Sequence, residues 1–215
     1  DKDGNFYTEN YRGAKAQYHY ICRDGVQTWH PSLTFYGFRY IRINDFPGGI
    51  DCVKPENFTA ITVHSNMKRT GFLSSSNTML NQLFSNIIWG QKGNFLDVPT
   101  DCPQRDERLG WTGDAQVFVR TACLNYDAEK FFTKWLADLA SDQHDDGYVG
   151  HVIPDLLQNP HASSAWGDAA VICPWQVYLA FGNKQILKNQ YQSMKKWIDY
   201  ITSTTTTKYL WTGGT

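Results

Sequence analysis

The sequence of 215 residues has little charge and no excess of either sign. Charged residues make up 19% of it, and 20 Lys and Arg against 21 Asp and Glu give a formal net charge of −1. A surface that binds nucleic acid needs clustered basic residues. No apolar run approaches the roughly 20 residues of a transmembrane helix. We therefore expect no nucleic-acid partner and no membrane partner.

Cysteine is also scarce and scattered. The five cysteines are Cys22, Cys52, Cys102, Cys123 and Cys173. No Cys-x-x-Cys pair is present, and His144 and His151 lack further ligands at matched spacing, so we predict no metal site. An odd, unclustered number favours reduced thiols and a cytoplasmic protein. Cys102 has no adjacent base, and we interpret it as a small buried residue rather than a nucleophile.

The first 66 residues have the patterns of β-strands. Apolar and polar residues alternate with period two over 16–22 and 38–43, and 58–63 is a β-branched run. Proline and glycine separate these runs. Three or four strands are too few to close a sandwich, so we interpret 1–66 as the last part of a β-sheet domain.

From about Ser75 the period of the apolar residues becomes helical. The first helix is predicted to begin after Ser76 or Asn77 as its N-cap. Further helices are predicted near Asp114, from Asp127, over 167–181 and over about 186–201. The apolar residues expected on the first two helices include Met79, Leu80, Leu83, Phe84, Ile87, Ile88, Val117, Phe118, Ala122 and Leu124. Periodicity alone allows any array of helices.

Residues 97–114, DVPTDCPQRDERLGWTGD, are the most informative stretch. The fourteen residues 101–114 include two arginines and a tryptophan. They also include four carboxylates, Asp101, Asp106, Glu107 and Asp114. Pro99 and Pro103 prevent a helix there. Cleavage of a glycosidic bond needs paired carboxylates, one of them protonated, and an aromatic ring offers a flat face to a sugar. A surface loop with an Arg–Asp salt-bridge network is the alternative interpretation.

This stretch resembles the acid-carrying motif of bacterial α-L-rhamnosidases, glycoside hydrolase family 78. The similarity extends over 58–113 and to Trp166-Gly-Asp-Ala169 with Pro174-Trp175, and 35–40 resembles the last strand of the family's β-sandwich. The resemblance implies a mixed fold, with the C-terminal part of a β-sandwich domain over 1–66. The N-terminal part of an (α/α)6-barrel catalytic domain, about five of twelve helices, would then follow over 67–215. We expect the chain to be a fragment, cut at both ends.

The resemblance also implies an activity and a set of site residues. The parent would be an inverting α-L-rhamnosidase that releases terminal α-L-rhamnose from glycosides without a cofactor. Glu107 aligns with the general acid. Asp101 matches a position that holds sugar hydroxyls and the charged transition state, and Arg105 would bind hydroxyls or orient a carboxylate.

Four further residues match or neighbour the family's rhamnose pocket. Trp111 and Trp166 would form an apolar wall for the C6 methyl group of rhamnose, although each is also compatible with a core position. Asp114 is either a substrate contact or a helix-terminal residue. Asp168 is a weaker pocket residue or the cap of the fourth helix.

The general base of the family has no counterpart in this sequence, since it lies far downstream of the acid motif. We therefore expect the chain alone to be inactive. Apolar faces of a partial barrel would stay uncovered and favour self-association. Two alternatives stay open, a glycosidase of the same barrel fold acting on another sugar and a noncatalytic carbohydrate-binding fragment.

Overall fold

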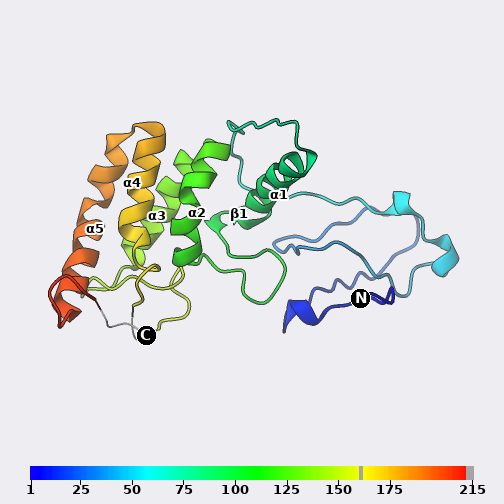
Figure 1. The fold of residues 1–215 in the computed structure, drawn as a ribbon. Helices are drawn as coiled ribbons and strands as arrows, with labels where there is room; N and C mark the ends of the chain where they lie inside the picture. The colour runs from blue at the N-terminus through cyan, green and yellow to red at the C-terminus, as the bar shows by residue number, and fades with distance from the viewer. Residues whose placement is uncertain (160–161, 212–215) are drawn as a thin grey trace. The chain divides into compact units, whose positions relative to one another are not determined.

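The computed structural model describes residues 1–159 and 162–211 (Figure 1). Positions 160–161 and 212–215 of the predicted catalytic domain lie outside these ranges. The chain forms two compact units, one of residues 1–63 with 102–108 and the other of 64–101 with 109–215. Residues 102–108, which contain Glu107, thus belong to the first unit although they follow the first helix in sequence. The two domains expected from the sequence stay a prediction.

The first unit contains short helices but, among its described residues, no strand. Its elements are the 3₁₀ helices η1 (Glu9–Tyr11), η2 (Ile50–Cys52) and η3 (Pro55–Asn57). The strands predicted over 16–22, 38–43 and 58–63, and with them the end of a β-sandwich, are not borne out. A strand exists only when a neighbouring strand completes its ladder of hydrogen bonds, and alternation does not supply that neighbour.

The second unit is helical, and the five helices expected from the sequence are confirmed. Its elements are α1 (Thr78–Asn94), β1 (Phe95–Leu96), β2 (Val98–Pro99), α2 (Thr112–Asn125), α3 (Glu129–Asp142), α4 (Ala169–Phe181) and α5 (Lys184–Thr204). The side chain of Asn77 accepts hydrogen bonds from the N–H groups of Met79 and Leu80 and so caps α1. Gly182 ends α4 in the left-handed conformation that favours glycine.

The core of the second unit lies among the last four helices. Helix α4 packs against α2, α3 and α5 (Figure 1). The largest fully buried side chains include Phe132 and Trp135 of α3, Val177 of α4 and Trp197 of α5. Burying a side chain of this size contributes about 1.5–3 kcal/mol, so this cluster holds together the elements that carry the candidate site.

Several of the apolar residues predicted on the first two helices are exposed. On α1 only Ile88 of the predicted apolar stripe is buried, and Met79, Leu80 and Leu83 are exposed. On α2, Val117 and Leu124 are exposed as well. The periodic pattern marks faces that can pack, but no element among the described residues covers these positions. None of the helices in the described residues is both long and apolar enough to cross a bilayer.

Candidate active site

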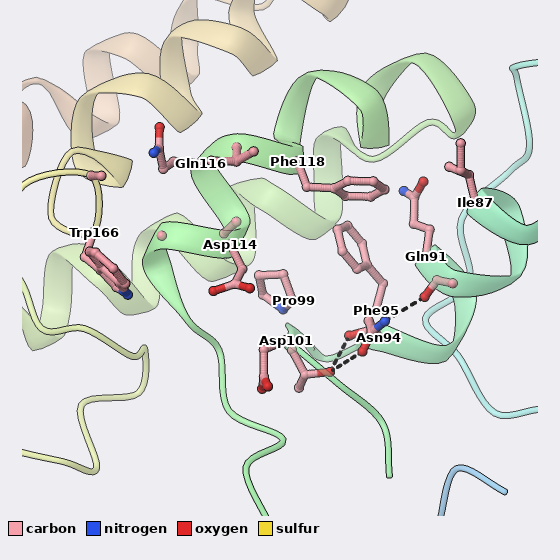
Figure 2. A pocket seen from close by; sticks show the side chains of 16 residues that line it. Ile87, Gln91, Asn94, Phe95, Pro99, Asp101, Asp114, Gln116, Phe118 and Trp166 are labelled. Carbon is pink, nitrogen blue, oxygen red and sulfur yellow. Dashed lines mark hydrogen bonds between the residues drawn. The ribbon is translucent and has the colours of Figure 1, made fainter. Parts of the chain in front are cut away.

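A cavity of about 600 Å³ lies within the helical unit, beside the first turn of α2 (Figure 2). Its wall comes from α1, the short strands β1 and β2 and the residue pair after them, the start of α2, and the loop before α4. The polar and aromatic lining residues include Gln91, Asn94, Asp101, Asp114, Phe118 and Trp166. Three residues predicted for the sugar site, Asp101, Asp114 and Trp166, are therefore brought to one cavity from separate segments.

Backbone pairing fixes the start of α2 and with it Asp114. The N–H and Oγ1 of Thr112 donate to the carbonyl of His151 at 2.9 and 3.0 Å, and Ile153 N–H donates to Gly110 at 2.8 Å. A Cβ at Gly110 would lie 2.2 Å from the Ile153 carbonyl oxygen, so this close approach requires glycine. Asp114 follows in the first turn, where the helix dipole stabilises a negative charge. Its carboxylate extends from α2 on the side where Asp101 lies in Figure 2.

Asp101 sits at the base of the motif loop. Its N–H donates to the Leu109 carbonyl at 3.2 Å, and its Oδ1 accepts from the Leu109 N–H at 3.2 Å. This reciprocal pair joins the two residues that flank 102–108. The segment 102–108, which carries Glu107, thus begins directly after Asp101, a residue that lines the cavity, and ends directly before Leu109.

Trp166 supplies the aromatic face of the cavity. The residue is 37% exposed, and its indole faces Gly113 in the first turn of α2. The His151 ring lies 5.9 Å from the indole, centroid to centroid. An exposed aromatic ring beside two carboxylates offers apolar contact and hydrogen-bond acceptors in the same space, which suits a ligand with hydroxyls and an apolar face.

Trp111 and Asp168 do not line this cavity. Trp111 is the half-buried N-cap residue of α2, and its buried indole N–H has no hydrogen-bond partner among the described residues. Asp168 stands at the N-cap position of α4 but makes no side-chain cap bond. Its Oδ2 accepts from Ala165 N–H at 2.8 Å and its Oδ1 from the Trp197 indole N–H at 3.1 Å. Asp168 therefore ties the loop before α4, which carries Trp166, to α5.

Glu107 and Arg105 are placed in the first unit. Glu107 Oε2 accepts from Arg105 Nε at 2.8 Å and from Arg12 Nη1 at 3.0 Å. The adjacent carboxylate of Asp106 accepts from the Gly13 N–H at 2.9 Å. The proposed acid is thus held by one arginine from its own motif and one from far upstream. Arg12 carries no sequence signal for this role, since it is a single basic residue 95 positions from its partner.

Two hydrogen-bonded amide side chains, Gln91 of α1 and Asn125 of α2, were not predicted from the sequence. Gln91 is buried, donates to the Ala122 carbonyl at 3.3 Å and accepts from Asn125 Nδ2 at 3.0 Å. The sequence does contain a signal for the role of Gln91, because this polar residue lies three residues after Ile88 on an otherwise apolar helix face. A polar residue on such a face is hydrogen-bonded or functional.

The two histidines considered as metal ligands belong to different hydrogen-bond networks. His144 Nε2 lies 3.0 Å from Asp155 Oδ2, whereas His151 Nε2 lies 2.9 Å from Ser163 Oγ. Both interactions brace the loops that follow α3.

Comparison with known proteins identifies the chain. The model of the bacterial alpha-L-rhamnosidase 6 hairpin glycosidase domain matches residues 68–215, and the model of the bacterial alpha-L-rhamnosidase concanavalin-like domain matches residues 1–64. The chain belongs to the bacterial α-L-rhamnosidase family. The resemblance seen in the motif at 97–114 is thereby confirmed, as is a helical glycosidase domain for the second unit.

Individual relatives agree with this family. An alpha-L-rhamnosidase of Formosa agariphila is 45% identical over 206 residues, which are 94% of this chain and 22% of that protein. One from Alteromonas sp. is 43% identical over 92% of this chain and 21% of its own length. The chain thus spans about a fifth of the curated relatives that it matches.

Solved α-L-rhamnosidase structures share the fold. The native enzyme from Aspergillus terreus superposes with a TM-score of 0.77 at 47% identity, covering 82% of this chain and 20% of that one. The Streptomyces avermitilis enzyme, complexed with L-rhamnose, gives a TM-score of 0.65 at 44% identity, covering 66% of this chain and 14% of that one.

Proposed function

We propose that this chain carries the general acid and one wall of the sugar pocket of an α-L-rhamnosidase, which removes terminal α-L-rhamnose from glycosides. The observation that carries the proposal is the cavity to which Asp101, Asp114 and Trp166 come from three segments of the helical unit. The names of the relatives supply the sugar. The cavity supports it chemically, because rhamnose combines hydroxyl groups with one methyl group.

In the proposed reaction Glu107 donates its proton to the glycosidic oxygen as the bond to the sugar breaks. The Asp101 and Asp114 carboxylates bind hydroxyls and stabilise the positive charge that develops on the ring. The Trp166 indole packs against the apolar side of the sugar, and Arg105 orients Glu107. Trp111 stays a proposed wall residue, whereas the contacts of Asp168 favour an anchoring role.

Inversion requires a second carboxylate that activates water on the opposite face of the sugar, about 6.5–9.5 Å from the acid. We place this base in a later part of the family's domain, in an (α/α)6 barrel of which α1 to α5 are the first helices. The 215-residue chain alone is therefore expected to bind sugar weakly and not to hydrolyse it.

The test is hydrolysis of p-nitrophenyl α-L-rhamnoside by a polypeptide of the relatives' full length that contains this chain. On phenyl α-L-rhamnoside, whose leaving group needs this proton, Glu107→Gln is expected to reduce kcat by about 10²–10⁴-fold. Glu56→Gln, at an exposed carboxylate of the same unit, is the matched control and should leave kcat unchanged. Unchanged turnover in Glu107→Gln would eliminate this residue as the acid.

The stereochemistry is tested separately by following the first product with proton NMR. Initial formation of β-L-rhamnose supports inversion, and initial formation of the α-anomer contradicts it. Binding of rhamnose without turnover by the full-length polypeptide would indicate the carbohydrate-binding alternative.

A further inference from the structure

We infer that Arg12 is a positioning residue of the general acid and that Arg12 and Arg105 together place the catalytic proton on Glu107 Oε1. This inference rests on the proposed role of Glu107. Both guanidinium groups donate to the same oxygen, Oε2, at 3.0 and 2.8 Å. An oxygen that accepts from two cationic donors has its lone pairs engaged, so the hydroxyl of the protonated acid is the other oxygen, Oε1.

The backbone around Arg12 is shaped for this contact. Ala14 N–H donates to the Tyr11 carbonyl at 3.0 Å and closes a turn with Arg12 and Gly13 at its centre. Arg12 has φ 54° and ψ −120°, the angles of the first central residue of a type II′ turn, where glycine is preferred. A long side chain in this sparsely populated region is the kind of local strain found at functional sites.

A second set of contacts ties the same turn to the motif. Gly13 N–H donates to Asp106 Oδ2 at 2.9 Å, and a Cβ at Gly13 would lie 2.8 Å from that oxygen. The Tyr11 hydroxyl donates to the Gly37 carbonyl at 3.3 Å, and Gly37 N–H donates to the Pro103 carbonyl at 3.0 Å. The turn therefore contacts the motif loop directly at Asp106 and Glu107 and is linked to Pro103 through Gly37. The contact of Arg12 with Glu107 is the one between two charged side chains.

The consequence for catalysis is that Glu107 delivers its proton from one defined oxygen atom. The proton on Oε1 passes to the glycosidic oxygen, and the electrons of the breaking bond stay with the leaving group. If Arg12 is removed, Arg105 alone holds Oε2 and the carboxyl group gains rotational freedom. Proton delivery then suffers most for leaving groups that cannot depart without a proton.

The experiment uses the full-length polypeptide and two substrates, phenyl α-L-rhamnoside and 2,4-dinitrophenyl α-L-rhamnoside. The first leaving group needs protonation and the second does not. Arg12→Gly removes the guanidinium at a position whose backbone angles suit glycine, so the turn is expected to be retained. We expect kcat/KM for the phenyl substrate to fall about tenfold or more and that for the dinitrophenyl substrate to change by less than about twofold.

Two further variants complete the design. Arg12→Lys keeps a cation and is expected to recover part of the activity on the phenyl substrate. Lys15→Ala removes an exposed cation three residues away and should match the wild type on both substrates. Thermal denaturation of each variant checks whether the folded structure is retained.

Equal losses on both substrates, or no loss on either, would overturn the role of Arg12. The proposed function is checked in the same series by Glu107→Gln, which should show the same dependence on the leaving group. If Glu107→Gln matches the wild type, or the wild type releases no rhamnose, the proposed function falls and this inference falls with it. If Glu107→Gln behaves as expected while Arg12→Gly does not, only this inference falls.

Discussion

A Cβ atom on Gly113 would lie 3.0 Å from Nε1 of Trp166, so the indole packs against the first turn of α2 more closely than an ordinary Cβ contact allows. A side chain larger than the hydrogen atom of Gly113 would therefore push away the indole that forms the aromatic wall of the cavity. Gly113 directly precedes Asp114 in α2. The contact joins two parts of the proposed sugar site that are more than fifty residues apart in sequence.

We predict that Gly113→Ala displaces the Trp166 indole and weakens sugar binding. KM for p-nitrophenyl α-L-rhamnoside in the full-length polypeptide should rise by roughly threefold to tenfold, about 0.7–1.4 kcal/mol, with a smaller change in kcat. Gly90→Ala is the matched control, because Gly90 also lines the cavity but a Cβ there meets no atom within 4 Å. Equal KM values for the two variants would show that the glycine contact does not set the position of the wall.

Asp168 is predicted to act through stability rather than through the sugar. In Asp168→Ala the fully buried indole N–H of Trp197 loses its acceptor, which should lower the free energy of unfolding by about 1–3 kcal/mol. Asp168→Asn retains an acceptor oxygen and should lose less. Urea unfolding of the 215-residue chain measures both.

The control for this prediction is Asp199→Ala, which removes an exposed carboxylate paired with Lys195. Exposed pairs contribute little, so a change below about 0.5 kcal/mol is expected. If Asp168→Ala destabilises no more than this control, the anchoring role is wrong and a direct role in the cavity regains support.

Local signals explain which features could be read from the sequence. Asn77 was recognisable as a helix boundary because N-capping depends on residues within one turn. The motif at 97–114 was recognisable because its charged and aromatic residues are consecutive. Each of these predictions needed information from only a few neighbouring positions.

Features that depend on distant partners were not accessible in this way. The strands expected in 16–22 and 38–43 needed neighbours that alternation cannot name. The role of Asp168 depends on Trp197, 29 positions later, and the environment of Glu107 depends on Arg12, 95 positions earlier. For the same reason the apolar stripe of α1 could be predicted from its period, whereas the element that covers it could not.

The buried thiols are predicted to be unreactive in the native chain. Burial raises the pKa of Cys123 to about 12 and also raises the pKa of Cys173, so both are protonated at about pH 8. Iodoacetamide should then modify the exposed Cys22 and Cys52 and leave Cys123 and Cys173 unmodified. Peptide mass spectrometry measures this, with denatured chain as the control in which all five react. Native labelling of Cys123 as fast as Cys22 would contradict the prediction.

The same burial should make stability fall at alkaline pH. Burial raises the pKa of Cys123 from its usual value of 9.0 to about 12, and chiefly burial raises the pKa of Tyr148 from its usual value of 10.0 to about 12. Because the native state holds these protons more tightly than the unfolded state, the stabilisation is complete below about pH 9 and is lost as the pH rises toward 12. Urea midpoints measured between these limits should fall steadily, and a flat profile would contradict this.

The exposed apolar residues of α1 should make the 215-residue chain self-associate. Met79, Leu80 and Leu83 lie within one and a half turns and are all exposed, and Met79 is 81% accessible. Contiguous exposed apolar surface favours association, so light scattering should show a mass that increases with concentration. Leu80→Lys combined with Leu83→Lys should reduce this mass toward 24.6 kDa, whereas Gln82→Lys, at an exposed polar position of the same helix, should reduce it much less. If Gln82→Lys disperses the chain equally well, added charge rather than the apolar face is responsible, and a monomer at every concentration would show that this face does not drive association.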